Sequence, residues 1–541
     1  MSELVETILK NRGYTRKAER ERFLRPRYDQ HPHDPGRLPD IGAATERVKR
    51  AIDAGETITV YGDYDIDGLS AAALLLDGLT AMGARVERYI PDRFQEGYGI
   101  NAKALQRLQA AGAGLIITVD CGSVSYEPLS WAAEAGLDVI VTDHHETGAS
   151  APDLPPAVAI VNPKRPDSDY AFSDLAGVGV AFKLIRALQH DYQLLPPGRE
   201  KWLLDLVALG TVCDVVDLID ENRVLVSYGL EVFRRTPRVG LQALAKVAGL
   251  PLEAVDTYHF GFVLGPRLNA AGRLEHALRA LEVLTTADKS EALAAARDLD
   301  ELNSQRRIQQ DEILTMARQQ AEEYADDPVL VLSHPDWNHG IVGIVASKIM
   351  EQYKKPTVIL QEQTDMAKGS ARSLGEFSMV AALRSADAVL DTYGGHQVAA
   401  GCRLPKDNIP ALREALHRYY AQHQFGDLDI RPEPDMTLEH LGDMREDTYQ
   451  ALQSLAPFGK GNPRPLFYAP DLGVRRADPV GKAGDHLKLT LTDGSADHEA
   501  IAFGFGGRAA SIDDTVGAWF ELDMNTYKGR TRPQLRVTEL T

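Results

Sequence analysis

The 541-residue sequence predicts an α/β protein with two α/β domains joined by a long helix and followed by a C-terminal β-barrel. Three observations support this prediction. Apolar strands alternate with amphipathic helices in two separate parts of the chain, and this alternation is typical of α/β domains with parallel strands. A segment at 287–327 lacks glycine and proline. Five short strand-like segments lie near the C-terminus.

The first α/β domain is expected at residues 41–285, after an N-terminal lead-in at 1–40 with an irregular stretch rich in proline and histidine. Its parallel sheet is expected to be covered by helices on both faces. The expected strands lie at 56–62, 115–119 and 138–142, and the expected helices at 69–83 and 126–136. From about 173 to 284 the pattern becomes mainly helical.

The connecting segment at 286–326 is rich in strong helix formers and predicts one or two long helices. A continuous helix of ~35 residues would span roughly 50 Å. The second α/β domain is expected at 327–425, with strands at 329–333, 357–361, 367–373 and 396–404 and helices at 340–353 and 378–390. Five short strands within 426–541 favour a small barrel of the OB-fold type.

Composition restricts the function only in part. The formal net charge of −19 argues against nucleic-acid binding over the whole surface, but it leaves room for a local basic groove. Cys121, Cys213 and Cys402 form no CxxC pair, so neither a disulfide framework nor a thiolate zinc site is indicated. The sequence has no apolar run of the ~20 residues that a membrane helix needs, and its start lacks a secretory signal. We therefore expect a cytoplasmic protein.

Three aspartates, Asp63, Asp65 and Asp67, lie between the first expected strand and the following helix. Carboxylates this close repel one another, and a divalent cation such as Mg²⁺ or Mn²⁺ removes that conflict. The alternative is a solvated acidic turn in which Asp67 caps the helix.

The acidic pattern recurs at the ends of the next two strands. Asp120 follows 115–119, and Asp143, His144 and His145 follow 138–142. The carboxyl ends of parallel strands meet at one edge of a sheet, where open α/β sheets bind ligands. Asp214 later interrupts an apolar run, where an acid is costly unless it is paired or binds metal. Each could be an ordinary loop or helix-end residue, but together they predict a metal site.

These motifs resemble, in chain order, the four motifs of the DHH phosphoesterase superfamily: Tyr61–Gly68, Asp120–Gly122, Asp143–His145 and Gly210–Asp214. Later segments resemble the RecJ family and its DHH-associated domain: Gly265–Arg273, Gly369–Ser373 and Gly394–Gly401. Leu455–Pro463 resembles the segment that leads into the OB-fold of that family. The resemblance covers nearly the whole chain.

The resemblance implies a 5′→3′ exonuclease that is specific for single-stranded DNA, releases 5′-mononucleotides and acts in DNA repair and recombination. It implies two Mn²⁺ or Mg²⁺ ions bridged by shared carboxylates. The residues that match ligands are Asp63, Asp65, Asp67, Asp120, His144 and Asp214, with Asp63 as a ligand or an outer partner. His145 matches the histidine near the scissile phosphate, and Asp143 is expected to orient a histidine.

The substrate side rests mainly on the resemblance. Ser370 and Arg372 lie two apart on an expected strand and therefore share a face, which suits phosphate oxygens. The family match assigns them the 5′ phosphate, helped by Arg267 or Arg273, although Arg267 could equally form a surface salt bridge. His396 is expected to face the active-site cleft.

One departure from the family pattern concerns the Trp-His pair before the helix at 340–353. In this chain Trp337 is followed by Asn338, and His339 comes one place later. This casts doubt on any role given to a histidine there.

The C-terminal strands carry basic residues interleaved with aromatic ones, as a single-strand binding platform would. They are Arg475, Arg476, Lys482, Lys488, Lys528, Arg530 and Arg532, with Phe467, Tyr468 and Tyr527. The resemblance further implies work with a RecQ-type helicase and a single-strand-binding protein, and we expect a monomer.

Two rival functions remain open. One is a DHH phosphodiesterase for short oligonucleotides or cyclic dinucleotides, which is disfavoured because such enzymes are generally shorter and lack the barrel. The other is a non-catalytic DHH-derived replication scaffold, which would show eroded acidic motifs, whereas those of this chain are intact.

Overall fold

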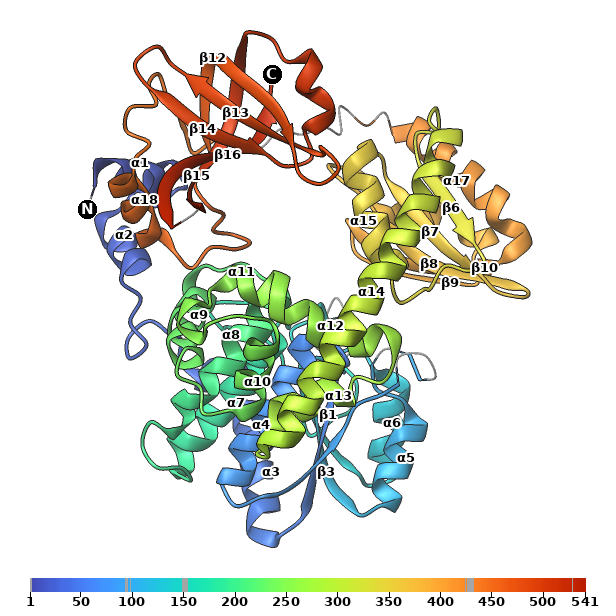
Figure 1. The fold of residues 1–541 in the computed structure, drawn as a ribbon. Coiled ribbons are helices and arrows are strands. Elements are labelled where there is room, and N and C mark those ends of the chain that lie inside the picture. The colour runs from blue at the N-terminus through green and yellow to red at the C-terminus, as the bar shows by residue number, and fades with distance from the viewer. Residues whose placement is uncertain are drawn as a thin grey trace. The chain divides into compact units, whose positions relative to one another are not determined.

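A computed structural model describes residues 2–92, 96–97, 99–147, 154–423, 425, 433–527 and 529–541. Its contacts divide the chain into two units (Figure 1). The first unit comprises Met1–Gly265, Leu281–Leu293 and Glu433–Thr541, and the second comprises Pro266–Ala280 and Ala294–Pro432. Helix α14 (Lys289–Glu323) joins them as one continuous helix of 35 residues, which confirms the predicted long connection.

The first unit contains a five-stranded sheet in the order β2-β1-β3-β4-β5, and all of its pairings are parallel, as predicted. Its strands are β1 (Thr57–Gly62), β2 (Arg85–Tyr89), β3 (Ala113–Val119), β4 (Asp138–Thr142) and β5 (Ala159–Val161). Helices α5 (Ala102–Ala110) and α6 (Tyr126–Glu134) cover one face, and α3 (Ile41–Ala54), α4 (Ile66–Ala81) and α7 (Gly177–Tyr192) cover the other.

The three predicted strands form the buried centre of this sheet. Apart from their first residues, β1, β3 and β4 are buried on both faces, and that burial explains their continuous apolar sequences. The sequence analysis did not predict the two edge strands. β2 has the polar sequence RVERY and is largely exposed, and β5 has only three residues.

After the sheet the first unit becomes helical, as expected. Its helices include α8 (Leu204–Cys213), α9 (Asp220–Phe233), α10 (Val239–Val247) and α11 (Thr257–His259), followed by a π-helix at Phe260–Leu264. Helices α8 and α9 pack closely on each other, and α8 also packs against α4 and α7. This packing brings the end of α8 to the sheet edge where β1 and β3 end.

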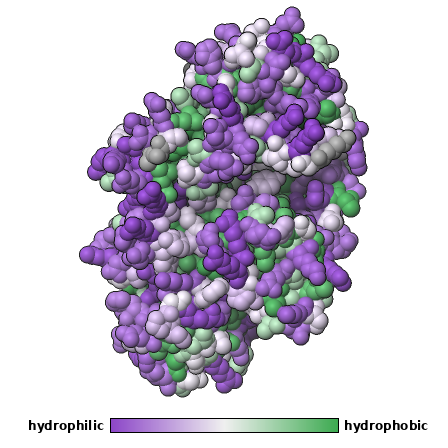
Figure 2. All heavy atoms as spheres, turned by 60° about the vertical axis from the view of Figure 1, so that its left-hand side comes forward, coloured by the Kyte–Doolittle hydropathy of each residue, from purple (hydrophilic) through white to green (hydrophobic). Residues whose placement is uncertain are grey.

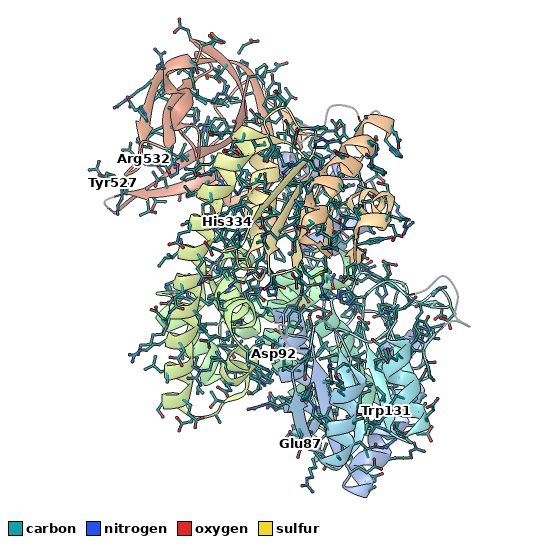
Figure 3. The ribbon with its side chains drawn as sticks, turned by 90° about the vertical axis from the view of Figure 1, so that its right-hand side faces the viewer. Glu87, Asp92, Trp131, His334, Tyr527 and Arg532 are labelled. Atoms are coloured by element: carbon teal, nitrogen blue, oxygen red, sulfur yellow. The ribbon has the colours of Figure 1, made fainter. Side chains whose placement is uncertain are left out.

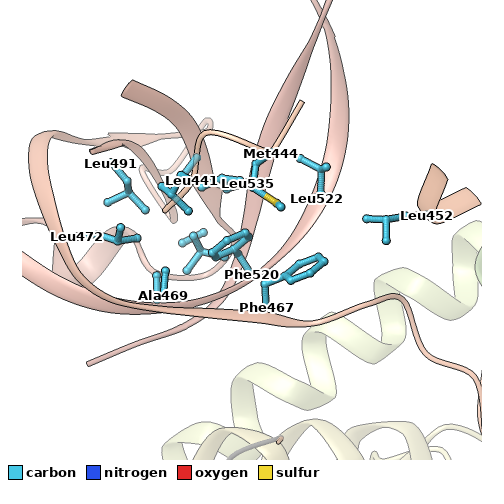
Figure 4. Close-up of a cluster of buried hydrophobic side chains, with 14 of the residues drawn as sticks. Leu441, Met444, Leu452, Phe467, Ala469, Leu472, Leu491, Phe520, Leu522 and Leu535 are labelled. Carbon is cyan, nitrogen blue, oxygen red and sulfur yellow. The ribbon is translucent and has the colours of Figure 1, made fainter. Parts of the chain in front are cut away.

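The C-terminal strands form a closed barrel, also in the first unit. The strands are β12 (Phe467–Val480), β13 (His486–Thr492), β14 (Asp497–Ala502), β15 (Thr515–Tyr527) and β16 (Arg530–Leu540). They run in the order β12-β13-β14-β16-β15, and β12 pairs again with β15 to close the barrel, with short β11 (Met436–Thr437) beside it. Phe467, Phe520 and leucines from several strands fill the interior (Figure 4).

Residues 1–40 are more ordered than the sequence analysis expected. Helices α1 (Glu3–Asn11) and α2 (Lys17–Leu24) precede the irregular stretch. Val5, Ile8, Leu9 and Phe23 are buried in the same hydrophobic cluster as the barrel interior. The N-terminal helices therefore complete the core of the C-terminal domain, a contact between distant parts of the sequence that local patterns do not reveal.

The second unit contains a mixed sheet in the order β6-β7-β8-β10-β9. Its strands are β6 (Leu330–His334), β7 (Thr357–Glu362), β8 (Met366–Arg372), β9 (Thr392–Gly395) and β10 (Ala399–Pro405). Only β6 and β7 pair in parallel, and the remaining pairings are antiparallel. Helices α15 (Val342–Tyr353), α16 (Met379–Ser385) and α17 (Ile409–His423) pack against this sheet.

The expected boundary between 425 and 426 adjoins residues 424 and 426–432, which lie outside the described part of the chain. Polar residues cover most of the face drawn in Figure 2, and apolar residues occur there in separate patches. Among the described residues, no helix combines the length and apolar character needed to cross a membrane.

Candidate metal centre

The acidic motif after β1 makes the turn into α4. Asp65 caps this helix, because its side chain accepts a hydrogen bond from Gly68 N at 3.1 Å. Asp67 lies in the first turn and is buried, as is Asp63. Gly68 is required for close packing, since a Cβ there would lie 2.7 Å from the Cβ and backbone nitrogen of Asp63. The helix cap is therefore Asp65, whereas the alternative interpretation gave that role to Asp67.

The N-terminus of α7 holds Asp67 in place. Its two carboxylate oxygens accept hydrogen bonds from the amides of Gly177 and Val178, at 2.5 and 2.9 Å. A Cβ at position 177 would lie 2.8 Å from Asp120 Cβ and 2.9 Å from Asp67 Oδ2, so only glycine fits. No role was predicted for Gly177 from the sequence. A glycine at the start of a helix is the only sequence feature that marks it, and such a glycine resembles an ordinary helix cap.

His144 lies at the centre of the cluster, where the ends of three elements meet. Its Nε2 atom is 3.1 Å from Asp120 Oδ1, 3.8 Å from Asp67 Oδ2 and 3.7 Å from Asp214 Oδ2. Asp120 directly follows β3 and has a left-handed backbone with φ of 61°, which turns the chain at the strand end. Asp214 directly follows α8. The sequence-predicted residues are thus brought together by the ends of strands β1, β3 and β4 and by helices α4 and α8.

Three groups of side chains have ligand atoms within 4.8 Å of one another. They are Asp63 with Asp65 and Asp120, Asp67 with His144 and Asp214, and Asp120 with His144 and His145. Asp120 and His144 each belong to two groups. All seven side chains named in the sequence analysis as ligands or as the phosphate-facing histidine therefore lie in one cluster.

Asp143 organises the histidine pair. Its Oδ1 atom accepts hydrogen bonds from His144 N at 2.7 Å and from His145 Nδ1 at 2.8 Å, and its Oδ2 accepts one from Ser123 N at 2.9 Å. Burial would raise the pKa of Asp143, but these hydrogen bonds outweigh it and hold the pKa below its usual range. Burial also opposes charge on His145, yet the contact with Asp143 raises the pKa of His145. Asn162 Nδ2 donates to His145 O at 2.9 Å and fixes the backbone there.

For Asp67, Asp120 and Asp214, burial and mutual repulsion outweigh any such hydrogen bonds, including the two that Asp67 accepts from the α7 amides. Burial, followed by the charge of Asp65, raises the pKa of Asp67 to about 7. Burial and the charge of Asp67 raise the pKa of Asp214 to about 9, and burial together with neighbouring aspartates raises that of Asp120 as well. Burial lowers the pKa of His144 to about 3, which keeps its imidazole neutral. Each of these carboxylates is therefore costly to ionise, and the imidazole beside them is neutral.

The residues fit a divalent metal. His144 Nε2 and Asp214 Oδ2 are buried and make no hydrogen bond within the described part of the chain. Carboxylate oxygens with one neutral imidazole suit Mn²⁺ or Mg²⁺ better than a soft metal. A bound cation would remove the repulsion and give the buried donor atoms a partner.

In the second unit, Ser370 and Arg372 share one face of β8, as predicted. A Cβ at Gly343, in the first turn of α15, would lie 3.1 Å from Arg372 Nη2 and 3.2 Å from Ser370 Oγ. Arg372 Nη1 donates to Ala371 O at 2.8 Å, and burial lowers the pKa of the guanidinium. No carboxylate of the described residues forms a salt bridge with it. We call these two side chains beside the start of α15 the β8 site.

The other predicted substrate residues have different surroundings. Arg267 Nε lies 2.9 Å from Asp300 Oδ1, as in the salt-bridge alternative, and Arg273 Nη1 donates to Gly340 O at 3.0 Å. His396 is exposed, and its backbone nitrogen donates to Ala399 O at 2.8 Å.

The departure at Asn338 has a local structural consequence. Its Oδ1 atom accepts a hydrogen bond from Gly340 N at 2.9 Å and shapes the turn before α15. Trp337 is buried, and His339 Nδ1 lies 3.2 Å from Gln361 Oε1.

The barrel corrects part of the expected single-strand platform. Phe467 is fully buried in the barrel core and presents no stacking face, and Tyr468 packs on Trp519 with ring centroids 4.1 Å apart. Three of the basic residues are paired: Arg475 with Asp497, Arg476 with Asp478, and Lys488 with Glu499. Lys528 lies outside the described residues.

The remaining basic residues lie at the loops of the barrel. Arg530 and Arg532 begin β16, and Lys482 lies between β12 and β13; none of the three has a salt-bridge partner among the described residues. Tyr527, at the end of β15, is 68% exposed. Tyr527 and Arg532 project together from the end of the β15–β16 hairpin (Figure 3).

Comparisons with known proteins agree with this architecture. The sequence profile of the DHH family N-terminal domain matches residues 57–211, that of the DHHA1 domain matches 326–422, and that of the RecJ OB domain matches 435–539. The chain is 37% identical over 545 residues to the single-stranded-DNA-specific exonuclease RecJ of Bacillus subtilis, covering 99% of this chain and 67% of that protein. It is 33% identical to the RecJ of Dickeya dadantii, covering 99% of this chain and 96% of that one.

Solved structures lead to the same family. The crystal structure of Thermus thermophilus RecJ with Mn²⁺ superimposes with a TM-score of 0.83 and 33% identity, covering 99% of this chain and 75% of that one. The same protein with Mg²⁺ gives a TM-score of 0.79, 31% identity and coverages of 99% and 74%. The DHH, DHHA1 and OB domains and the similarity over nearly the whole chain have one consistent explanation. The chain belongs to the RecJ family of single-stranded-DNA-specific exonucleases.

Proposed function

We propose that the chain digests single-stranded DNA from the 5′ end and releases 5′-mononucleotides by metal-dependent hydrolysis. The observation that carries this proposal is the acidic cluster around His144, because its buried carboxylates need a cation and lie at the sheet edge where ligands bind. The names of the RecJ relatives supply the substrate class, single-stranded DNA, and the structures of one relative contain Mn²⁺ or Mg²⁺.

Two ions would be held by two adjoining groups of residues, because Asp120 Oδ1 of one group lies 3.1 Å from His144 Nε2 of the other. Asp63, Asp65 and Asp120 form one candidate group, and Asp67, His144 and Asp214 form the other. When bound, such ions supply an activated water and neutralise charge on the phosphoryl and leaving oxygens. Burial keeps the His144 imidazole neutral and so available as a ligand, and the α7 amides keep the Asp67 carboxylate in position.

His145 would act on the phosphate rather than on the metals. Its Nδ1 is engaged by Asp143, so Nε2 is the atom that can reach a substrate oxygen. The raised pKa of His145 favours the protonated ring, which donates a charged hydrogen bond to a phosphoryl oxygen. Asp143 is then a positioning residue, since it holds the ring and makes no proposed contact with the substrate.

Selection of the 5′ end is assigned to the β8 site. A terminal phosphate carries one more ionisable oxygen than an internal phosphodiester, so a guanidinium and a hydroxyl can distinguish the two. Arg372 suits this task because it is partly buried and forms no salt bridge with an acid in the described part of the chain. The adjacent start of α15 adds backbone amides with a favourable dipole. Arg267, Arg273 and His396 remain candidates for contacts further along the strand.

The barrel would bind the strand through its loops. OB-folds bind oligonucleotides with the loops between strands 1 and 2 and between strands 4 and 5. These loops correspond to 481–485, which contains Lys482, and to the β15–β16 hairpin with Tyr527, Arg530 and Arg532. We further propose a monomeric cytoplasmic protein whose substrates come from a RecQ-type helicase and a single-strand-binding protein.

Digestion of long single strands labelled at the 5′ or the 3′ end, with Mn²⁺ titrated from zero, tests the proposal. Early release of a labelled mononucleotide from the 5′ end only, and only with metal, is the expected result. Early release from the 3′ end would refute the polarity. Cleavage of dinucleotides but not of long strands would favour the short-oligonucleotide phosphodiesterase instead, and no hydrolysis at any Mn²⁺ concentration would favour a scaffold.

A further inference from the structure

The segment from Leu455 to Asn462, which leads into the barrel, has an unusual set of partners. Every backbone carbonyl from Leu455 to Lys460 accepts a hydrogen bond although the segment is neither helix nor sheet through most of its length. The donors are Asn462 Nδ2 to Leu455 O and Pro457 O, Arg223 to Ala456 O and Pro457 O, Thr257 Oγ1 to Phe458 O, Asn462 N to Gly459 O, and Leu218 N to Lys460 O. We call this segment the 455–462 strap.

Three of these donors belong to the α/β domain and not to the barrel. Arg223 lies in α9, is 2% exposed, and also donates to Phe23 O, so its guanidinium donates hydrogen bonds to backbone carbonyls of two other segments. Thr257 begins α11, and Leu218 lies between α8 and α9. The strap is therefore fixed on the helical part that follows the sheet, and it is more than a linker to the barrel.

The strap also contacts the loop at 214–218. This loop begins with Asp214 and joins α8 to α9. Lys460 O accepts Leu218 N at 2.8 Å, and Lys460 Nζ lies 3.6 Å from Asp217 Oδ1. Leu218 is itself buried, so both its side chain and its amide depend on this packing.

Two glycines of the strap allow that approach. Gly461 has φ of +71°, and a Cβ there would lie 2.8 Å from Asp217 Cβ and 3.2 Å from Asp217 Cα. A Cβ at Gly459 would lie 2.6 Å from Leu218 Cδ1. The backbone of the strap thus lies in direct contact with the loop. A methyl group at Gly461 would displace the backbone around Asp217, three residues from Asp214.

We propose that the 455–462 strap positions Asp214 for metal binding, so that an element of the C-terminal domain helps to set the affinity of the metal centre. A second contact holds the same loop, because Nδ2 of Asn222 in α9 donates a hydrogen bond to Asp217 O at 3.0 Å. The loop is therefore held by both α9 and the strap. A displacement of the strap would be transmitted to the Asp214 carboxylate, which lies 3.7 Å from His144 Nε2. This inference rests on the proposed function, because it takes Asp214 as a metal ligand.

Gly461→Ala tests this, with the dissociation constant for Mn²⁺ measured by calorimetry on the full chain. Because outer partners of metal ligands typically contribute ten- to a hundred-fold to metal affinity, we expect affinity to fall by about that factor. Excess Mn²⁺ should restore most of kcat on a short oligonucleotide with little change in KM. Binding of a long single strand without metal should stay at the wild-type level.

Gly494→Ala is the matched control, since Gly494 also lies in the barrel domain, has φ of +85° and has no atom within 4 Å of an added Cβ. It carries the same backbone strain without the clash and should keep wild-type Mn²⁺ affinity. Removing the clashing Cβ in the double variant Gly461→Ala with Asp217→Gly should recover affinity relative to Gly461→Ala.

Folding is checked by circular dichroism. Should Gly461→Ala not fold, Gly459→Ala gives the second measurement, because its methyl group meets only the end of the Leu218 side chain and should cause a smaller loss in the same direction. A folded strap variant with wild-type Mn²⁺ affinity overturns the inference and leaves the proposed function intact. A wild-type chain that binds no Mn²⁺ overturns both.

Discussion

The metal centre of the first unit and the β8 site of the second unit are built in opposite ways. The metal centre gathers acids that are mostly buried, with Asp67 and Asp143 fixed by backbone amides, and burial together with neighbouring aspartates makes Asp120 and Asp214 costly to ionise. The β8 site places one partly buried guanidinium beside a hydroxyl and the start of a helix, and no acid among the described residues forms a salt bridge with it. Each site is electrostatically incomplete, and the missing charge has the opposite sign in each.

This contrast indicates which ligand belongs to which site. Burying charged groups without compensation is costly. A bound ligand of opposite charge would supply that compensation. In the proposed function, a cation would complete the first site and a phosphate would complete the second. A two-metal centre alone would meet similar phosphodiesters in either direction along a strand, and we therefore assign the proposed polarity of digestion to the second site.

The strongest test of the contrast is to remove one shared acid. Asp120 belongs to two of the candidate ligand groups and has φ of 61°. Asn tolerates this left-handed backbone better than Ala does, so Asp120→Asn isolates the charge from the backbone strain. We expect a loss of more than about a hundredfold in kcat/KM for single-stranded DNA, because losing a shared ligand should exceed the effect of losing an outer partner.

The control for this variant is Asp471→Asn. Asp471 is exposed in the barrel domain and has a similar φ of 54°. It should keep wild-type activity and melting temperature. Near-wild-type turnover by a folded Asp120→Asn protein would remove the metal assignment and with it the contrast between the two sites.

The second test is made at the β8 site. Arg372→Ala should lower kcat/KM on 5′-phosphorylated strands much more than on 5′-hydroxyl strands. A charge-assisted phosphate contact contributes roughly 1.5–3 kcal/mol, which corresponds to about ten- to a hundred-fold. Arg372→Lys should recover only part of this loss, because an ammonium cannot form the paired contacts of a guanidinium.

Arg403→Ala serves as the matched control for Arg372→Ala. Arg403 lies on β10, which pairs with β8, and its Nε is 3.6 Å from Asp391 Oδ2. Its removal should affect both kinds of 5′ end equally and weakly. If Arg372→Ala also lost both activities equally, Arg372 would support the fold or the general path of the backbone instead of recognising the end.

The third test compares stability with and without metal. Mn²⁺ at a hundredfold excess over its dissociation constant should stabilise the first unit by about 2.7 kcal/mol. Calorimetry of the wild type with Mn²⁺ or EDTA would measure this as a higher melting temperature. Asp120→Asn should show a much smaller rise, since it removes one ligand and part of the repulsion. An equal rise in both proteins would place the stabilising ion elsewhere.

The sequence was sufficient for the parts of the fold that are locally encoded. The central strands β1, β3 and β4 are buried on both faces and therefore apolar throughout, and α14 lacks breakers. β2 escaped prediction because an edge strand can be polar. The packing of α1 and α2 on the barrel also escaped, since Phe23 reaches its partners only through contacts between distant parts of the sequence.

The candidate site shows the same division. Acids at strand ends can be recognised from the sequence because parallel strands bring those ends together. The amides that hold Asp67 come from Gly177 and Val178, which are distant in sequence and chemically unremarkable there. Whether a basic residue is free or paired also depends on the fold: Arg475 and Arg530 look alike in the sequence, yet only Arg475 has an acidic partner among the described residues.

The difference between Arg530 and Arg475 leads to the prediction with the smallest expected effect, which concerns strand binding by the barrel. Deleting the barrel would uncover Val5, Ile8 and Phe23, so a truncation would confuse strand binding with misfolding. The double change Arg530→Ala with Arg532→Ala avoids this problem, because both residues are exposed and begin β16. Binding of a long single strand should weaken modestly.

The salt dependence of that binding decides the outcome. Each phosphate contact on a single strand contributes about 0.7 to the slope of log K against log salt, so losing two should reduce the slope by about 1.4. Arg475→Ala with Arg476→Ala removes the same formal charge from residues that are already paired with Asp497 and Asp478, and it should change the slope much less. Equal changes in the two double variants would mean that net charge alone attracts the strand and that the β15–β16 hairpin has no special place in its path.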